Sequence, residues 1–244
     1  MTAKDWQRRL NDCGITCTEK QAEQLQQYHQ LLLEWNQRMD LTAVTGEDEM
    51  LDRHYTDSLM ALTVPGLIPD GASLIDVGTG AGFPGLPLKI LRPDLSLHLL
   101  DAQQKRLTFL SCVTESLGLD NVMMVHLRAE DGGRNQCYRE RFDLAVARAV
   151  APLPVLAELL LPFVKTGGKA VCWKGPALTE EREQGRKAAF LVGGKLSETI
   201  PYQILGRDWS HCLVILEKDR PTPKIYPRKA GTPAKLPLGS MMLR

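Results

Sequence analysis

The chain has 244 residues, of which 43% are hydrophobic and 24% are charged, and its formal net charge is +1. This composition is that of an ordinary globular protein, and the length allows one large domain or one domain with appendages. No apolar run approaches the ~20 residues of a membrane span, and the first residues lack the apolar core of a signal peptide, so we expect a cytoplasmic protein without a membrane partner. The six cysteines and five histidines are scattered along the chain, so no metal site and no disulfide framework are expected.

The N-terminal part, residues 1–62, is expected to be helical. The sequence Thr18-x-x-Gln21 is a possible capping box, and apolar residues then recur at helical spacing as far as Met39. After a turn expected at Thr45-Gly46, a further helix is expected from about residue 48 to 62, with acidic residues at its start, where they suit the helix dipole. An amphipathic helical region needs a surface to pack against, so we expect residues 1–65 to pack on the sheet domain that follows.

A short apolar strand leads directly into a cluster of glycines, with Gly78, Gly80 and Gly82 at every second position. Such a turn uses glycine because a Cβ disfavours the backbone conformations it needs, and because a ligand can then approach the main chain. Counted from Gly80, the spacing matches the dinucleotide fingerprint G-x-G-x-x-G of Rossmann-type NAD-dependent enzymes. Counted from Asp76, it matches the acid-first pattern Asp-x-Gly-x-Gly-x-Gly of S-adenosylmethionine-dependent methyltransferases.

The methyltransferase count fits better. On the dinucleotide count, Asp76 would be an unpaired carboxylate inside a parallel strand, which is costly to bury. On the methyltransferase count, Asp76 lies at the end of the strand, where it can accept hydrogen bonds from the turn or from the ammonium group of the cofactor. Asp101 ends the next strand and can bind a ribose diol in either class of enzyme. A tight turn without a ligand is the plain alternative.

Residues 66–218 alternate strands and helices, which predicts an α/β fold: a Rossmann-like class I methyltransferase sheet with an N-terminal helical extension. Strands are expected near 74–77, 97–101, 122–127, 142–147, 169–173, 199–205 and 211–217, and helices near 85–92, 104–117, 152–164 and 179–191. The last two strands are joined by a short polar link, so we expect them to pair antiparallel. Arg148 ends the fourth strand at the crevice where α/β folds bind ligands. It either pairs with a structural carboxylate or holds a ligand anion, and we favour the ligand.

Residues 219–244 form a basic, proline-rich tail. From residue 218 onward, seven Lys or Arg stand against one Asp, so this end carries +6 and the first 217 residues carry −5. Dense prolines stop helix and sheet, favour extended chain and display the charges outward. The tail can therefore follow a phosphate backbone, with Tyr226 available to stack on a base, unless it is only a disordered, solvated segment. We expect its removal to weaken RNA binding and to spare cofactor affinity.

Together these features resemble one family, the bacterial 16S ribosomal RNA guanine-N7 methyltransferases known as RsmG or GidB. The likeness covers most of the chain and rests on these segments: Trp35-Asn36 with Leu41-Thr42, Arg53-His54 with Asp57-Ser58, Ile75 to Leu88, Leu100-Asp101 with Lys105-Arg106, Ala129-Glu130, Ala147-Arg148-Ala149, Trp173-Lys174-Gly175, and Tyr226 to Pro237. Asp40 is a departure, because the family often has Asn there, and this puts only a local hydrogen bond in doubt.

The resemblance implies S-adenosylmethionine as the cofactor and 16S ribosomal RNA, or the small ribosomal subunit, as the partner. The cofactor-binding candidates are Asp76, Gly78, Gly80, Gly82, Phe83, Asp101, Ala129, Glu130 and Arg148. Phe83 would cover an apolar face of the ligand, unless it is simply a core residue. Ala129 and Glu130 would read the adenine, unless Glu130 is a solvated loop acid. Arg148 would clamp the carboxylate of the cofactor or donate to guanine O6.

The resemblance also implies contacts to RNA, for which the candidates are Lys105, Arg106, Lys224, Tyr226, Arg228, Lys229 and Lys235. The stems of Lys105 and Arg106 can equally cover a helix face. Guanine N7 has an exposed lone pair at neutral pH, so we assign no catalytic acid or base and expect catalysis by positioning. His54 is either structural or a substrate contact. Two other functions stay open: a dehydrogenase, and an RNA- or ribosome-binding module without catalysis.

Overall fold

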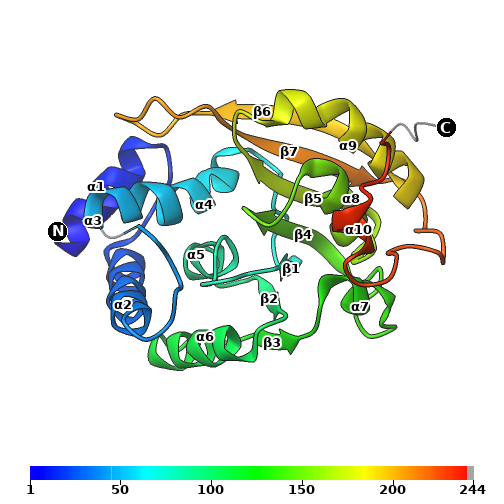
Figure 1. The fold of residues 1–244 in the computed structure, drawn as a ribbon. Coiled ribbons are helices and arrows are strands. Elements are labelled where there is room, and N and C mark those ends of the chain that lie inside the picture. The colour runs from blue at the N-terminus through cyan, green and yellow to red at the C-terminus, as the bar shows by residue number, and fades with distance from the viewer. Residues whose placement is uncertain (45, 241–244) are drawn as a thin grey trace.

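The computed structural model describes residues 1–44 and 46–240. Thr45, in the turn expected at Thr45-Gly46, and the last four residues of the predicted tail lie outside the described residues. A seven-stranded sheet has the order β3-β2-β1-β4-β5-β7-β6 (Figure 1). Its strands are β1 (Ser73–Val77), β2 (Ser96–Asp101), β3 (Val122–His126), β4 (Phe142–Arg148), β5 (Val164–Lys174), β6 (Gly194–Tyr202) and β7 (His211–Lys218). The first five strands are parallel, and β6 and β7 pair antiparallel, as predicted.

Helices cover both faces of the sheet, because its inner strands are apolar on both sides. In β1, Leu74 belongs to the core of one face and Ile75 to the core of the other. The first face is covered by the N-terminal helices, α5 (Gly85–Leu91) and α6 (Gln104–Ser116). The second is covered by α8 (Leu153–Leu160) and α9 (Leu178–Val192). The result is the three-layered α/β arrangement that the sequence predicts.

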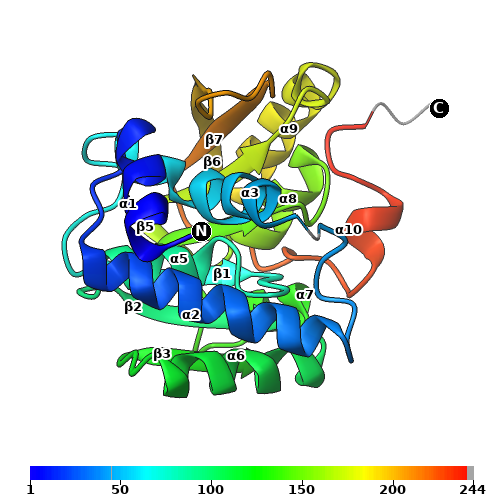
Figure 2. The same cartoon turned by 90° about the vertical axis from the view of Figure 1, so that its left-hand side faces the viewer.

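The N-terminal region is helical, as predicted, and α2 crosses the sheet domain above α6 (Figure 2). Helices α1 (Ala3–Asp12) and α2 (Glu19–Asn36) each begin at a capping box, and the second is the predicted pair Thr18 and Gln21. The helix expected over 48–62 is a continuous helical stretch of four parts: α3 (Glu47–Met50), the π-helical turn η1 (Leu51–Thr56), α4 (Asp57–Leu59) and the 3-10 turn η2 (Met60–Thr63). π-helical turns are frequent at functional sites.

Three elements of the sheet domain differ from the prediction. Strand β5 begins at Val164, and not near residue 169. Strand β6 begins at Gly194, directly after the left-handed residue Gly193 that ends α9, and not near residue 199. A bulge between Leu196 and Glu198 interrupts the alternation of side chains between the two faces of the strand. The first half of the strand therefore lacks the period of two by which strands are predicted from sequence. A short helix, α7 (Ala129–Arg134), also follows β3 where none was predicted.

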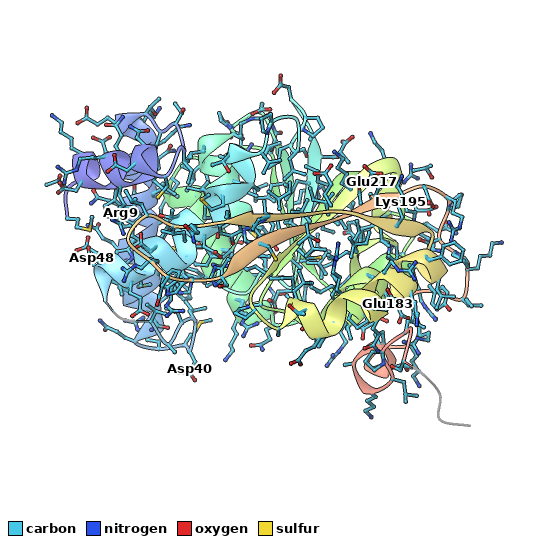
Figure 3. All side chains as sticks on the ribbon, turned by 90° about the horizontal axis from the view of Figure 1, so that it is seen from above. Arg9, Asp40, Asp48, Glu183, Lys195 and Glu217 are labelled. Atoms are coloured by element: carbon cyan, nitrogen blue, oxygen red, sulfur yellow. The ribbon has the colours of Figure 1, made fainter. Side chains whose placement is uncertain are left out.

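The hairpin of β6 and β7 crosses the molecule to the N-terminal helices (Figure 3). One end of the hairpin carries the ion pair of Lys195 and Glu217, and the other reaches the neighbourhood of Arg9. There the carboxylate of Asp52 accepts hydrogen bonds from Arg9 at 2.8 Å and from Arg207, in the hairpin loop, at 2.7 Å. Asp52 is only 1% exposed, so these two guanidinium groups fix the loop to the N-terminal region.

The tail is folded against the domain, which corrects the prediction that it is an extended chain. We call residues 219–240 the C-terminal strap; it includes α10 (Thr232–Lys235), which lies beside α8 (Figure 1). The fully buried Glu158 of α8 binds the guanidinium of Arg228 at 2.6 Å, and Tyr226 is only 9% exposed. In this arrangement Arg228 is engaged by Glu158 and Tyr226 is packed in the core, and contacts of either residue with RNA stay predictions. The other predicted contacts of the strap are exposed: Lys224, Lys229 and Lys235.

Candidate active site

The glycine turn joins β1 to α5. Gly78, Gly80 and Gly82 have φ angles of +73°, +60° and +101°, in the left-handed region that favours glycine. The carboxylate of Asp76 fixes the turn, because its Oδ2 accepts hydrogen bonds from Thr79 Oγ1 at 2.8 Å and from the backbone N–H of Gly85 at 2.9 Å. Of the two partners expected for Asp76, the structure thus shows the turn.

The later glycines of the cluster serve packing. A Cβ on Gly82 would lie 2.5 Å from the hydroxyl of Tyr28 in α2, and one on Gly85 would lie 2.8 Å from Asp76 Oδ2. The same Tyr28 hydroxyl donates a hydrogen bond to the carbonyl of Ala81. The structure therefore gives Gly82 a role in packing the turn against the N-terminal helices, and its approach to the cofactor stays a prediction.

The earlier glycines face outward. A Cβ on Gly80 would meet only the carbonyl oxygen of Gly78, at 4.0 Å, so this side of the turn is open. A Cβ on Gly78 would lie 3.0 Å from the exposed side chain of Val150. Gly80 is thus the position at which the turn has open space for a ligand, whereas Val150 lies against Gly78.

Asp101 ends β2 beside the open side of the turn. Its Oδ2 accepts hydrogen bonds from Gly80 N at 3.0 Å and from the Arg106 guanidinium at 3.3 Å, while Oδ1 accepts one from Gln103 N at 2.8 Å. Arg106 thus pairs with Asp101, and its contact with a phosphate stays a prediction. Lys105 beside it is exposed.

Phe83 is a buried member of an aromatic cluster. Its ring stacks on Tyr28 with a centroid distance of 5.4 Å and on His54 with a centroid distance of 4.9 Å. The Arg148 guanidinium carbon lies 5.2 Å from the centroid of the same ring. Phe83 is therefore a core residue, which was the alternative to a ligand contact. Its ring packs against His54 and Arg148.

Ala129 and Glu130 begin α7, at the end of β3. Glu130 is buried, and its Oε1 accepts a hydrogen bond of 2.7 Å from the backbone N–H of Gly231 in the C-terminal strap. The alternative of a solvated loop acid is therefore wrong. Gly132 explains why this short helix sits so close to the sheet, because a Cβ there would lie 3.0 Å from both Leu100 and Phe163.

Arg148, at the end of β4, pairs with a carboxylate. Its Nη1 lies 3.0 Å from Asp57 Oδ2, and the guanidinium also donates to the carbonyl of Arg53. Asp57 Oδ1 accepts further hydrogen bonds from the hydroxyl of Tyr202 at 2.6 Å and from Nδ1 of His211 at 2.9 Å. Arg148 thus pairs with a structural carboxylate, which was one of the two alternatives predicted for it. Binding of a ligand anion by Arg148 stays a prediction.

Charges in this cluster follow from burial and from the donors around Asp57. Burial opposes ionisation of Asp57, but hydrogen bonds from His211 and Tyr202 and the charge of Arg148 outweigh it and lower its pKa. Burial, together with the carboxylate of Asp57, raises the pKa of Tyr202. The cluster therefore holds an anionic carboxylate, the guanidinium of Arg148 and a neutral phenol.

His54 is neutral and fully engaged. Burial and the charge of Arg148 lower its pKa to about 4. Its Nδ1 lies 3.2 Å from Arg148 Nη2, which can only donate, so Nε2 carries the proton and donates to Thr42 Oγ1 at 2.7 Å. This histidine positions Arg148 and has no free nitrogen for proton transfer.

A cavity of about 410 Å³ opens above this cluster. Its lining residues are Val44, Arg53, His54, Asp57, Arg148, Ala149, Ala151, Trp173, Lys174, Gly175, Tyr202 and His211. A larger groove of about 1320 Å³, between α9 and β6, shares Gly175, Tyr202 and His211 with it. The cavity and the groove therefore adjoin each other.

Several residues of this cavity had no role in the prediction. Trp173 and Lys174 belong to a segment of the family resemblance, yet nothing in their spacing assigned them a contact. Tyr202 and His211 come from the hairpin, where they are directly paired across β6 and β7. The short link between the two strands was a signal for this pairing, since a hairpin places the residues that flank its loop opposite each other.

The fold and the turn define a class I methyltransferase. Two solved structures of low sequence identity share the fold. The 16S rRNA (adenine(1408)-N(1))-methyltransferase from Catenulisporales acidiphilia has a TM-score of 0.51 and 13% identity, covering 62% of this chain and 87% of its own. The Pyrococcus horikoshii protein TYW2 has a TM-score of 0.52 and 12% identity, covering 73% of this chain and 66% of its own.

The family follows from sequence. A family model described as rRNA small subunit methyltransferase G matches residues 21–203. The ribosomal RNA small subunit methyltransferase G of Leuconostoc citreum is 48% identical over 98% of this chain and 100% of its own length. That of Alkaliphilus metalliredigens is 47% identical over 93% of this chain and 95% of its own. The chain belongs to this family of ribosomal RNA methyltransferases, which confirms the resemblance and the predicted fold.

Within residues 1–44 and 46–240, no group of three or more His, Cys, Asp and Glu side chains could hold a metal ion. Nor does any helix of that part have the length and apolarity needed to cross a membrane.

Proposed function

We propose that the chain transfers a methyl group from S-adenosylmethionine to N7 of a specific guanine in 16S ribosomal RNA. The family membership supports methyl transfer to ribosomal RNA. One structural observation supports the placement of the cofactor and the base side by side: the segment 148–151 connects the glycine turn with the cavity. Val150 lies against Gly78, while Ala149 and Ala151 line the cavity. A cofactor on the turn and a base in the cavity would therefore be neighbours.

The residues around the turn fit S-adenosylmethionine. Gly80 offers open space next to the carboxylate of Asp101, whose oxygens suit the two hydroxyl groups of a ribose. Glu130 offers an acceptor for an amino group. When bound, the cofactor supplies an electrophilic methyl group on a sulfonium.

The cavity suits a purine base that has left its stack. Its volume of about 410 Å³ is in the range of small-molecule sites, and an enzyme that modifies a base must extrude it from a helix or bind it in a single strand. Lys174 lines the cavity, held by Glu181 at 2.7 Å and by the carbonyl of Ala151 at 3.3 Å. The ammonium of Lys174 and the guanidinium of Arg148 can donate to guanine O6, which leaves N7 free to attack.

No general base is assigned, because none is needed. Guanine N7 is unprotonated at neutral pH, so catalysis rests on holding the base in line with the methyl group. Both nitrogens of His54 are engaged, by Thr42 and Arg148, and Nδ1 of His211 is hydrogen-bonded to Asp57. Both histidines contribute to the wall of the cavity.

The groove between α9 and β6 suits the RNA on either side of the target guanine. It adjoins the cavity and is lined by Arg182 and Trp209, among others. The Arg53 guanidinium carbon lies 4.4 Å from the ring centroid of Trp209, so an aromatic surface and a cation meet where the groove leaves the cavity. RNA recognition commonly combines such stacking with phosphate contacts.

Two variants separate the turn from the cavity. Gly80→Val forces a β-branched residue to φ +60° on the open side of the turn, so it should abolish binding of S-adenosylhomocysteine in a calorimetric titration without unfolding the chain. Lys174→Ala should keep that binding and lower methyl transfer to small-subunit RNA by about tenfold or more, as expected for the loss of one buried donor. Normal affinity in Gly80→Val would remove the turn from the cofactor site, and full transfer by Lys174→Ala would remove the cavity from the substrate site.

A further inference from the structure

We infer that the C-terminal strap contributes to cofactor affinity, because the backbone N–H of Gly231 holds the carboxylate of Glu130 in position. This inference rests on the proposed cofactor site. It replaces the expectation that the tail and cofactor affinity are independent. Glu130 belongs to α7 and Gly231 to the strap, yet Oε1 and N lie 2.7 Å apart.

The hydrogen bond uses one oxygen of the carboxylate. Among the described residues, no donor contacts Oε2 of Glu130, so that oxygen is left to accept a hydrogen bond from a ligand. A glutamate side chain has several rotamers, and a charge-assisted bond from a fixed N–H selects one of them. Holding an acceptor before the ligand arrives lowers the entropic cost of binding.

The strap is fixed on both sides of this bond. The buried Glu158 of α8 binds both the backbone N–H of Arg228, at 2.7 Å, and its guanidinium, at 2.6 Å. Arg134, the last residue of α7, donates to the carbonyl of Pro227 at 2.6 Å. The strap is thus fastened to the two helices that follow β3 and β4, and the position of Gly231 is set by buried contacts.

Gly231 favours glycine because of its left-handed backbone conformation, and not because a side chain would clash with a neighbour. Its φ is +80°, and a Cβ there would meet nothing within 4 Å. A side chain at this position therefore strains the backbone without a clash, and the strain is relieved when the residue turns its N–H away from Glu130. Asn tolerates the left-handed conformation better than Ala does.

The test compares three single variants by calorimetric titration with S-adenosylhomocysteine. We expect Gly231→Ala to raise Kd by roughly fivefold and Gly231→Asn to raise it by less. Gly167→Ala is the matched control, since Gly167 also has a positive φ (+89°) and open space, but lies in β5. It should lower the melting temperature about as much as Gly231→Ala does and leave Kd unchanged.

A double-mutant cycle shows whether the effect passes through Glu130. In a Glu130→Ala background, adding Gly231→Ala should leave Kd where Glu130→Ala alone put it. Equal Kd values for Gly231→Ala and wild type would overturn the inference, and so would additive effects in the cycle, which would indicate general loosening of the strap. Absence of binding by the wild type would instead refute the proposed cofactor site itself.

Discussion

Asp76 lies at the end of β1 with no exposed surface, and burial raises its pKa to about 7 from an ordinary value of 3.8. Its Oδ1 is buried and has no hydrogen-bond partner within the described part of the chain, which adds to the cost of ionisation. The cofactor-free fold therefore binds a proton that the unfolded chain releases between about pH 4 and pH 7. This group stabilises the fold at low pH, and that contribution is lost as the pH rises through 7.

Replacing Asp76 by Asn should remove this pH dependence. The amide oxygen can still accept from Thr79 and Gly85, and the side chain stays neutral at every pH. We expect the free energy of unfolding of Asp76→Asn, relative to wild type, to rise between pH 5 and pH 8. Urea unfolding of both cofactor-free proteins at these two pH values measures it, and the other titrating groups cancel in the difference. A difference that does not change with pH would contradict the protonation of Asp76.

At the scale of elements, buried carboxylates join segments that are distant in sequence, and no local sequence pattern predicts these contacts. Asp52 joins the hairpin loop to the N-terminal helices, Asp57 joins the hairpin to β4, and Glu158 joins the strap to α8. In each case a carboxylate with little exposed surface accepts from arginine or from several donors. Such a group is costly to leave without its partners, so each junction is specific.

The Glu158 junction gives a direct test. Glu158→Ala leaves the guanidinium and the N–H of Arg228 without their acceptor, and breaking a buried pair typically costs about 3–5 kcal/mol. We expect the free energy of unfolding to fall by about that amount in a urea titration. Glu183→Ala is the control, because its pair with Arg186 is exposed and such pairs are worth about 0–1 kcal/mol. Similar losses in the two variants would show that the strap is not held by Glu158.

The sequence predicted those elements whose signal is local. Asp76, Gly78 and Gly80 could be placed at the strand-turn junction because strand period and glycine spacing coincide there. The pairing of Arg148 with Asp57 could not be predicted, since the two residues are 91 positions apart. Asp57 also lies in the N-terminal helical region, which was expected only to pack on the sheet.

The strap was misread for the same reason. Proline and lysine content is local, whereas the buried acceptor Glu158 that fixes Arg228 is 70 positions away. Helix α7 is weak by propensity, with two adjacent glycines, and forms where Gly132 lets it pack on Leu100 and Phe163.

At the scale of the whole molecule, the N-terminal helices, the sheet and the hairpin all contribute to one site. The cavity takes Val44 and His54 from the N-terminal region, Arg148 from β4 and His211 from β7. The strap contacts Glu130, one of the predicted cofactor-binding residues. The N-terminal region is thus part of the site and more than a cover for the sheet.

The exposed lysines of the strap remain the predicted contacts to RNA. Replacing Lys224, Lys229 and Lys235 together by Gln should weaken binding to small-subunit RNA and reduce the slope of log affinity against log salt by about 0.7 for each phosphate that the strap no longer neutralises. Replacing the exposed Lys4, Lys20 and Lys195 by Gln removes the same charge elsewhere and serves as the control. Filter binding at several salt concentrations measures both. An equal slope in the two triple variants would mean that the strap makes no phosphate contact.

The central claim is that one site brings S-adenosylmethionine and a single ribosomal guanine together. The most direct measurement is methyl transfer from radiolabelled S-adenosylmethionine to small ribosomal subunits and to their naked RNA, followed by mapping of the modified nucleotide. We predict one guanine, methylated at N7, in at least one of the two substrates. Transfer to another base or another atom, or binding of the cofactor without any transfer, would contradict the account.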